Sequence, residues 1–321
     1  AEQLFKKKFA AELGPTALKE FETNFRASFI QEKDFAQIAK WRFNSLRVPF
    51  NFRLVESAPY KYSKAGLAYL DQVVKWAKKY KIWIILDLHA APGAQNHDWH
   101  SDSLGPAELW TKESNRKRVY ALWEFLADHF KDEEMIAGYD LLNESVTNDT
   151  KTLNIFYHEL IKHIRKVDRN HILFIEGNRW SQDVEVLEEF KDDNVVISIH
   201  NYEPLQFTFN FIPHLRYPLK GRQSPIQWNE KVTRDHLLKY KKFSERRHVP
   251  IHVGEFGVNY REGMYGEDSW LKEVLKCFND YGFHWNYWTY KAVKHFMFPD
   301  GVMSYYPNPV WVNRPGPLSG G

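Results

Sequence analysis

The chain has 321 residues, of which 43% are hydrophobic and 26% charged, so it can bury a large core and does not have the composition of a disordered protein. Its formal net charge of +3 is small for this length, which excludes the strongly basic surface of proteins that bind nucleic acid or anionic membranes. No apolar run reaches the roughly 18 residues needed to span a membrane, so we expect neither nucleic acid nor a membrane as a partner.

Short apolar runs alternate with longer amphipathic segments along the chain. Residues 1–42 read as helical, for example in TALKEFETNFRA and QEKDFAQIAKWR. The β-rich apolar runs that follow predict strands at 44–50, 82–89, 136–144, 171–177, 194–202, 250–257 and 283–290. Apolar residues at helical spacing predict helices at 64–80, 112–130, 151–168, 229–247 and 268–281. The alternation predicts the α/β class.

The polar ends of the apolar runs distinguish between the two α/β architectures of this size. Continuously apolar runs are typical of parallel strands covered on both faces. Nearly every run carries polar residues towards its end, namely Arg47, Asp87 with His89, Asn143 with Glu144, Glu176, His200 with Tyr202, and Glu255. A closed barrel gathers all these ends at one mouth, whereas an open sheet gathers few of them and usually has a glycine-rich phosphate loop, which this sequence lacks. We therefore predict a (β/α)8 TIM barrel whose first strand is missing from this chain.

The remaining features of the sequence favour one domain over residues 1–321, acting as a monomer. There is no internal repeat, and no low-complexity linker precedes the tail PGPLSGG. A single cysteine, Cys277, allows neither an intrachain disulfide nor a cysteine-based metal site, and we expect it in the core. The first residues lack the apolar centre of a signal peptide, which leaves the compartment open, with secretion favoured.

Two glutamates follow apolar runs, Glu144 after YDLLN and Glu255 after IHVG. One such residue alone is usually only solvated. Two of them at one barrel mouth, among histidine, asparagine, tyrosine and arginine, fit the pair of carboxyl groups that glycosidic cleavage requires. One must be protonated to donate to the leaving oxygen, and the other must be ionised to attack the anomeric carbon.

Six motifs occur in order with barrel-like spacing: LRVPF, DLHAAPG, LLNES, ISIHNYEP, HVGEFG and NYWTYK. In this set the chain resembles glycoside hydrolase family 5, retaining β-glycanases on the (β/α)8 barrel that include many cellulases. The resemblance runs from about residue 30 to about residue 312. It implies a hydrolase that acts on a polysaccharide or oligosaccharide without a cofactor or metal. The chain departs from the family at Ser145, where proline is common.

The resemblance implies a role for each matched residue. Glu144 would be the general acid/base, and Glu255 would be the nucleophile. Asn143 would hydrogen-bond the sugar 2-hydroxyl, and Arg47 would hold the nucleophile in its ionised form. His200 and Tyr202 would orient the catalytic carboxylates. His89 would contact the sugar in the cleaved subsite, and Trp288 would stack on that sugar. An arginine beside a carboxylate lowers the carboxyl pKa, whereas a general acid needs a raised pKa.

The sequence leaves the substrate partly open. Loop aromatics that could stack on further sugar units are Trp99, Trp180, Trp228 and Tyr260. We expect a retaining endo-acting β-glucanase that cleaves β-1,4-linked or mixed-linkage glucans. A β-1,3-glucanase, a β-glucosidase or a β-mannanase of the same family stays open, as does a catalytically silent carbohydrate-binding barrel.

A metal-dependent barrel enzyme, such as an isomerase or a deacetylase, is the third alternative. The loop segment AQNHDWHSD holds His97, Asp98, His100 and Asp102 within six residues. Histidine and aspartate are metal ligands, although this spacing matches no common zinc pattern.

Overall fold

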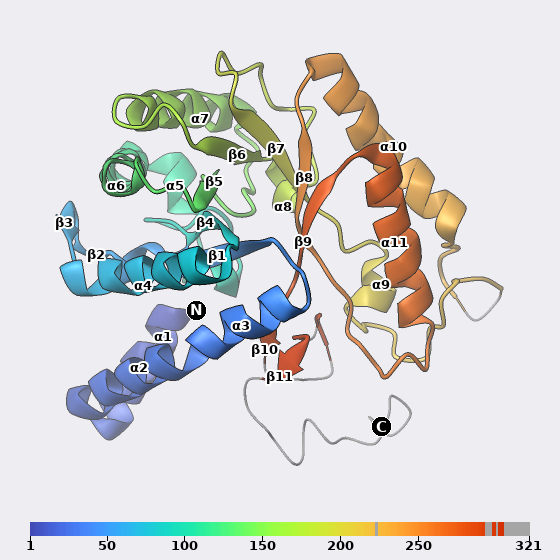
Figure 1. The fold of residues 1–321 in the computed structure, drawn as a ribbon, viewed down its shortest axis with the longest axis horizontal. Helices are drawn as coiled ribbons and strands as arrows, with labels where there is room; N and C mark the ends of the chain where they lie inside the picture. The colour runs from blue at the N-terminus through green and yellow to red at the C-terminus, as the bar shows by residue number, and fades with distance from the viewer. Residues whose placement is uncertain (222–223, 293–296, 300, 305–321) are drawn as a thin grey trace. The chain divides into compact units, whose positions relative to one another are not determined.

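The computed structural model describes residues 1–221, 224–292, 297–299 and 301–304 (Figure 1). The chain divides into two compact units, residues 1–197 and 198–321, and strand β7 (Val195–His200) runs from the first into the second. None of the described helices combines the length and the apolar character that a membrane-spanning helix needs.

Unit 1 begins with helices, as the sequence predicts: α1 (Glu2–Leu13), α2 (Pro15–Phe29) and α3 (Glu32–Lys40). Gly14 turns the chain between the first two with a φ of 89°, a conformation that costs glycine little. Phe21 packs against Phe5 and Phe9 across this helical hairpin, at ring-centroid separations of 5.5 and 5.2 Å. In the described part of the chain no strand precedes residue 45, and the three helices come before β1.

The parallel sheet of unit 1 follows the helices. Its strands lie in the order β1 (Ser45–Asn51), β4 (Trp83–Ala90), β5 (Ile136–Asp140) and β6 (Ile172–Glu176). Strands β4, β5 and β6 are buried over most of their length, as expected for a parallel sheet covered on both sides. The register sets Asp87 beside Pro49 on one neighbouring strand and beside Asp140 on the other. Polar groups of neighbouring strands therefore lie at one level of the sheet.

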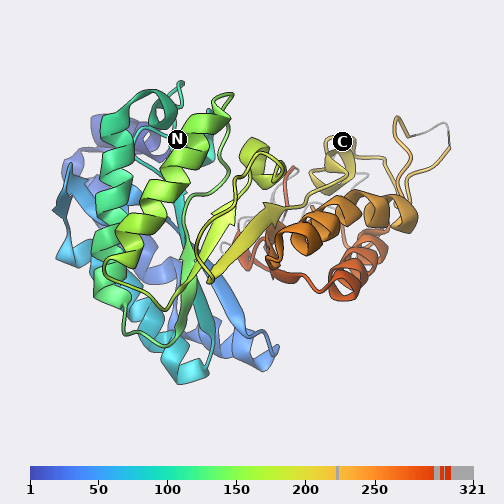
Figure 2. The same ribbon diagram turned by 90° about the horizontal axis from the view of Figure 1, so that it is seen from above.

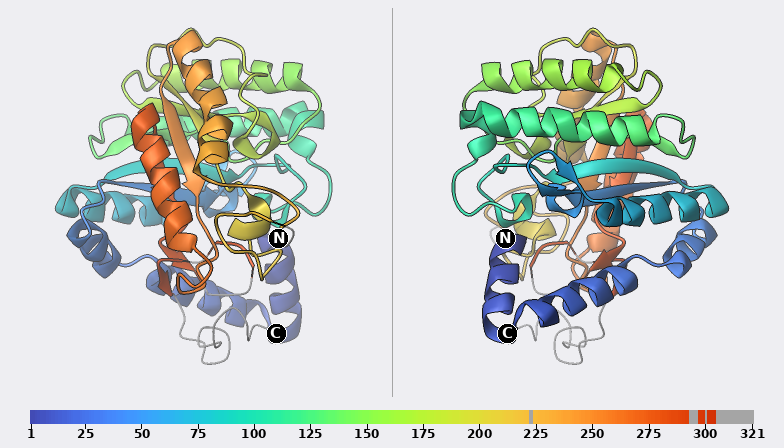
Figure 3. Two further views of the ribbon diagram at one scale, coloured as in Figure 1. Left: turned by 90° about the vertical axis from the view of Figure 1, so that its right-hand side faces the viewer. Right: turned by 90° about the vertical axis from the view of Figure 1, so that its left-hand side faces the viewer.

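Three long helices connect these strands: α4 (Lys64–Tyr80), α6 (Glu113–Phe130) and α7 (Thr150–Arg165). Side-chain caps begin two of them, because Ser63 accepts from the Gly66 N–H and Asp149 accepts from the Thr152 N–H. Helices α6 and α7 pack side by side (Figures 2 and 3). An antiparallel pair, β2 (Glu56–Ala58) and β3 (Lys61–Tyr62), follows β1, and the short helices are η1 (Phe52–Leu54), η2 (Trp99–Ser101), α5 (Glu108–Thr111) and α8 (Asn178–Ser181).

Unit 2 contains the second half of β7 and then α9 (Leu205–Thr208), α10 (Glu230–Arg247), β8 (Ile251–Phe256), α11 (Glu267–Tyr281) and β9 (His284–Tyr287). Strands β8 and β9 are parallel, and α10 packs against α11 (Figure 3). Cys277 is fully buried in α11, as predicted. After β9 come only the two-residue strands β10 (Lys291–Ala292) and β11 (Met303–Ser304) in the described chain.

The seven predicted strands each overlap an observed strand, in order β1, β4, β5, β6, β7, β8 and β9. The five predicted helices correspond to α4, α6, α7, α10 and α11. The prediction of strand and helix alternation is thus confirmed for the described residues between 44 and 287.

Candidate active site

One buried guanidinium in unit 1 binds three buried carboxylates. The Arg47 Nε donates to Asp140 Oδ2 at 2.7 Å, and its Nη2 lies 3.0 Å from Glu176 Oε1 and 3.2 Å from Asp87 Oδ2. The same Nη2 donates to Asn143 Oδ1 at 2.8 Å. The Arg47 side chain is 3% exposed and the three carboxylates are fully buried. Arginine suits this position because its planar fork can donate in several directions at once.

This cluster holds more acidic groups than basic ones. Burying uncompensated charge is costly. Burial raises the pKa of Asp140 well above its usual range, and the negative charge of Glu176 raises it further, against the opposing effect of Arg47. Burial thus favours the protonated form of Asp140. The result is a bonded frame across four strands that also fixes the amide of Asn143.

Glu144 has an unusual backbone conformation directly after Asn143. Its φ is 48°, in the left-handed region that glutamate rarely adopts, and the residue is only 9% exposed. The Glu144 N–H donates to Glu176 Oε2 at 2.6 Å, and the Glu144 carbonyl accepts from Asn96 Nδ2 at 2.9 Å. Strained backbone of this kind persists where its surroundings hold it, and it is enriched at functional sites.

His100, on η2, contacts the side chain of Glu144. The His100 Nε2 is 3.0 Å from Glu144 Oε2 and 2.9 Å from Asn96 Nδ2. The Asn96 amide is oriented by its own bonds, since its Oδ1 accepts from the Asp98 N–H and its Nδ2 donates to the Glu144 carbonyl. Asn96 therefore presents an N–H to His100, and a neutral imidazole with its proton on Nδ1 provides the matching acceptor.

His89 and Gln95 tie the loop after β4 to the strand ends. The His89 Nδ1 is 2.8 Å from Asp87 Oδ2, which orients the imidazole ring. The Gln95 side-chain amide donates to the carbonyls of His89 and Asn143, each at 2.8 Å. The loop that carries His100 is thus bonded to both strands beside it.

Trp180 lies on a strained turn next to this loop. Arg179, Trp180 and Ser181 have φ values of 54°, 55° and 62°, three consecutive left-handed residues that L-amino acids normally avoid. The Trp180 indole N–H donates to Asp98 Oδ2 at 2.7 Å, and its backbone N–H donates to the Ser145 carbonyl at 3.3 Å. The side chain remains 40% exposed, so a large ring is held beside the residue that follows Glu144.

Glu255 in unit 2 is 5% exposed and has a different set of partners. The Tyr202 hydroxyl donates to Glu255 Oε2 at 2.7 Å, and His200 Nδ1 lies 3.6 Å from the same oxygen. The Asn201 N–H donates to the Glu255 carbonyl at 2.9 Å. A Cβ on Gly254 would come within 2.7 Å of the Ser198 hydroxyl oxygen, so a larger residue before Glu255 would displace the Ser198 side chain. His200 and Tyr202 thus surround the carboxylate that the resemblance assigns to them.

The aromatic candidates differ in their exposure. Trp288 is half-buried, and its backbone N–H donates to the carbonyl of Phe256 at 2.8 Å. Phe256 directly follows Glu255 in the chain. Trp99 is 68% exposed. Trp228 and Tyr260 are half-buried, and the Trp228 indole donates to Thr233 at 2.9 Å. Trp99 and Trp180 are therefore the two candidates with a large open ring.

The four acidic and histidine residues of the segment 94–102 have separate protein partners. Besides the contacts of His100 and Asp98 given above, His97 Nδ1 is 2.6 Å from the Gly105 carbonyl. Asp102 accepts from Arg53 Nε at 3.0 Å and from the backbone N–H of Gln3 at 2.8 Å. Within the described chain no three of these four residues have ligand atoms that all lie within 4.8 Å of one another.

Sequence reasoning missed four residues of this site: Gln95, Asn96, His100 and Asp140. His100 fell within the metal alternative, and Asp140 was not singled out. Asp140 did carry a signal, because IAGYD places a charged residue at the end of a buried run, and such a residue requires a buried partner. The contact of His100 with Glu144 had no local signal, since it depends on the path of the loop.

Comparison with known proteins identifies similar chains. The profile of one family, Cellulase (glycosyl hydrolase family 5), matches residues 9–294. A β-xylosidase of Phanerodontia chrysosporium is 31% identical over 288 residues, which are 85% of this chain and 59% of that relative. Endoglucanase C of Acetivibrio thermocellus is 28% identical over 297 residues, 83% of this chain and 85% of the relative. The chain thus spans less than two thirds of the β-xylosidase.

A solved structure shows the same fold. A hyperthermophilic endo-β-1,4-glucanase in complex with substrate matches with a TM-score of 0.69 and 24% identity over 83% of each chain. The fold class predicted from the sequence, the (β/α)8 TIM barrel, is thereby confirmed, with seven of its parallel strands in the described residues.

Proposed function

This chain belongs to glycosyl hydrolase family 5 and is a glycoside hydrolase, and from this premise we propose that it is a retaining, endo-acting β-glucanase of β-1,4-linked or mixed-linkage glucans. In this proposal residues 1–321 act as one catalytic domain. Glu144 is the general acid/base, and Glu255 is the nucleophile.

The observation that carries the assignment is the contrast between the partners of the two glutamates. A hydroxyl donor, from Tyr202, approaches the carboxyl group of Glu255. An acceptor nitrogen, from His100, approaches that of Glu144. A donor complements an ionised carboxylate, and an acceptor complements a protonated carboxyl group. Environments that separate two carboxyl groups in this way distinguish the acid from the nucleophile.

The reaction proceeds in two displacements. First, Glu144 gives its proton to the glycosidic oxygen while Glu255 attacks the anomeric carbon, so that the glycosidic bond breaks and a glycosyl ester forms. Then Glu144 takes a proton from water, the water oxygen attacks the same carbon, and the Glu255 carboxylate leaves. Two inversions give net retention of the anomeric configuration.

Asn143 is proposed to bind the sugar 2-hydroxyl. Arg47 occupies the Asn143 amide oxygen, and no group in the described chain accepts from the buried Asn143 Nδ2. A buried donor without a partner is costly, and a substrate hydroxyl would satisfy it. His89 and Trp288 contact the same sugar in this proposal, and Trp180 stacks on a neighbouring unit.

The substrate class is argued from the relatives. Endoglucanase C is similar over 83% of this chain and over 85% of its own length, which favours internal cleavage of a β-glucan. The β-xylosidase has the higher identity of 31%, so exo-cleavage of short β-xylosides is the second candidate function.

A substrate panel combined with two variants tests the proposal. Barley β-glucan, carboxymethyl-cellulose, laminarin, mannan, xylan and aryl β-glycosides are incubated with the chain, and products are sized. Glu255→Ala abolishes hydrolysis, and azide partly restores turnover with a product of inverted configuration. Glu144→Ala spares the first step on activated aryl glycosides only. The exposed Glu134 provides the matched control, Glu134→Ala. Unchanged hydrolysis in both active-site variants would overturn the assignment.

A further inference from the structure

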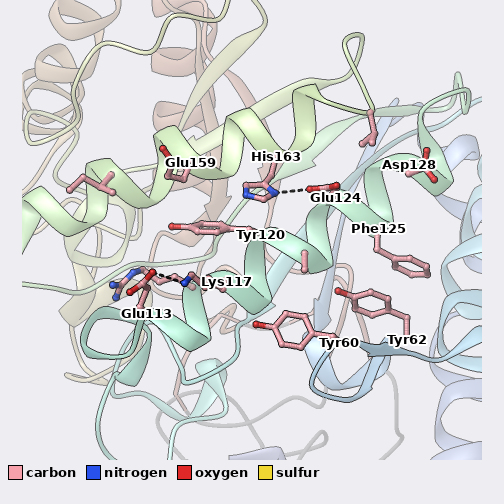
Figure 4. A pocket seen from close by; sticks show the side chains of 14 residues that line it. Tyr60, Tyr62, Glu113, Lys117, Tyr120, Glu124, Phe125, Asp128, Glu159 and His163 are labelled. Carbon is pink, nitrogen blue, oxygen red and sulfur yellow. Dashed lines mark hydrogen bonds and ion pairs between the residues drawn. The ribbon is translucent and has the colours of Figure 1, made fainter.

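A groove lined with tyrosines lies on the outside of unit 1, between the β2–β3 hairpin and helices α6 and α7 (Figure 4). It encloses about 970 Å³, and its wall includes Tyr60, Tyr62, Tyr120, Phe125 and Ile155. None of its lining residues belongs to the candidate active site. We propose that this tyrosine groove is a second glycan-binding site, which holds an uncharged β-glucan chain on the outer helices; this goes beyond the proposed catalytic function.

Tyr60 forms the rim of the tyrosine groove from a strained position. Its φ is 62° and its side chain is 52% exposed, although glycine, asparagine or aspartate normally occupies such hairpin positions. The Tyr60 N–H donates to Glu56 Oε1 at 2.8 Å, and Arg118 holds Glu56 through a second bond of 2.7 Å. The turn is therefore fixed, and a bulky ring is displayed at a site where the backbone disfavours it.

The deeper rings of the groove are held in stacked pairs. Tyr62 stacks on Phe125 with centroids 4.2 Å apart and an interplanar angle of 17°. Tyr120 stacks on His163 at 5.3 Å, also at 17°. Rings with an apolar face and a polar edge are suited to sugar rings, which have both kinds of surface, and pre-fixed rings lose little conformational entropy on binding.

The Tyr62 hydroxyl is a candidate polar contact for the sugar. It is buried and has no hydrogen-bond partner in the described residues. Burial raises the pKa of Tyr62 to about 12, so the hydroxyl keeps its proton at neutral pH. In the proposed complex a sugar hydroxyl accepts a hydrogen bond from this O–H.

The charges of the groove point to an uncharged ligand. Each of its four carboxylates has a basic partner: Glu113 with Lys117 at 2.8 Å, Glu124 with His163 at 2.6 Å, Asp128 with Lys131 at 2.9 Å, and Glu159 with Lys162 at 2.6 Å. Figure 4 shows the first two pairs on the groove wall. The wall also contains Arg116, which donates to the backbone carbonyls of Leu109 and Trp110 at 2.9 Å each. The paired carboxylates attract neither a polyanion nor a polycation strongly, whereas their free lone pairs can accept from sugar hydroxyls.

Native gels that contain barley β-glucan or hydroxyethyl-cellulose test the inference. The full chain carries Glu255→Ala, so that the polymer is not consumed. Tyr60→Ala is expected to weaken the affinity for the polymer about fivefold to tenfold, the loss of one stacked ring, and Tyr60→Phe to preserve it. Tyr69, which is 38% exposed on α4 outside the groove, provides the matched control Tyr69→Ala. Adding Tyr62→Ala weakens binding further, with folding checked by thermal unfolding.

Equal migration of Tyr60→Ala and its parent in every gel would overturn the inference, and so would an equal loss in Tyr69→Ala. Hydrolysis by the chain with native Glu255 is measured separately. If the chain hydrolyses no substrate but Tyr60→Ala lowers its affinity for the polymer, the catalytic proposal is wrong and glycan binding at the tyrosine groove is supported. Hydrolysis with no effect of Tyr60 on affinity would support the catalytic proposal and overturn the groove.

Discussion

The His100 Nε2 lies 3.0 Å from Glu144 Oε2, and this contact joins the loop after β4 to the residue that we propose as the general acid. Asn96 presents its amide N–H to the same nitrogen at 2.9 Å. The nitrogen is therefore an acceptor in the neutral imidazole, and an acceptor favours the protonated carboxyl group that the first step consumes. In the proposed mechanism the loop therefore supports the proton transfer from Glu144 as well as holding its own side chains in place.

Replacing His100 with phenylalanine keeps a planar ring and removes the acceptor. We expect kcat/KM on unactivated oligosaccharides to fall about tenfold to a hundredfold, because one hydrogen bond to the acid is lost. The alkaline limb of the pH profile should move to lower pH, since the protonated form of Glu144 loses its partner. Dinitrophenyl glycosides, whose leaving group needs no proton, should be affected far less. His97→Phe in the same loop is the control, and equal effects of the two variants would contradict the role of His100.

Replacing Trp180 with alanine removes the exposed ring beside Ser145. If the ring stacks on a sugar, KM for oligosaccharides rises about fivefold to tenfold with kcat nearly unchanged. Trp180→Phe keeps part of the aromatic surface but loses the bond to Asp98, so its KM should lie between those of the native chain and Trp180→Ala. Trp83 at the opposite end of β4 is 46% exposed, and Trp83→Ala should leave KM unaltered. A change in kcat alone would argue for a positioning effect of Trp180 instead.

Replacing Arg47 with methionine leaves three buried carboxylates without their cation. We expect the free energy of unfolding to drop by about 3–5 kcal/mol, as for other broken buried ion pairs. Arg53, whose side chain is 43% exposed in its pair with Asp102, is the matched comparison, and Arg53→Met should cost less than about 1 kcal/mol. Urea unfolding curves of both variants measure the difference, and coincident midpoints would refute the buried frame.

Replacing Asp140 with asparagine tests which carboxyl group retains its proton. The pKa of Asp140 is raised in the folded chain, so folding binds a proton, and its contribution to stability is lost as the pH rises above the unfolded value of 3.8. Asp140→Asn removes this loss while its amide oxygen can still accept from Arg47. Relative to the native chain, the variant should therefore gain stability as the pH rises from about 4 to 7. Urea unfolding at several pH values shows it, and the opposite trend would mean that Asp140 is ionised.

Most of the fold and the positions of the two candidate glutamates can be predicted from the sequence. The strands and helices follow from local patterns, as in 82–89 and 151–168, where apolar runs and helical spacing lie within one segment. The placement of Glu144 and Glu255 at strand ends follows from the same patterns. The hydrogen-bond partners of Glu144 and Glu255 do not follow from local patterns. The segment 94–102 has ligand-like spacing, yet tertiary contacts with Arg53 and Trp180 give its side chains separate partners. The raised pKa of Asp140 likewise depends on groups from four strands far apart in the chain.

Helix α1 is attached to this loop at its very start. Gln3 binds Asp102 through its backbone N–H at 2.8 Å and through its side-chain amide, only two residues after His100. Helix α1 therefore holds in place the loop segment that carries His100. A protein trimmed to begin at residue 14 would keep every strand and both glutamates. We nonetheless expect it to hydrolyse substrate more slowly, because the contacts of Gln3 with Asp102 that hold the His100 loop would be lost.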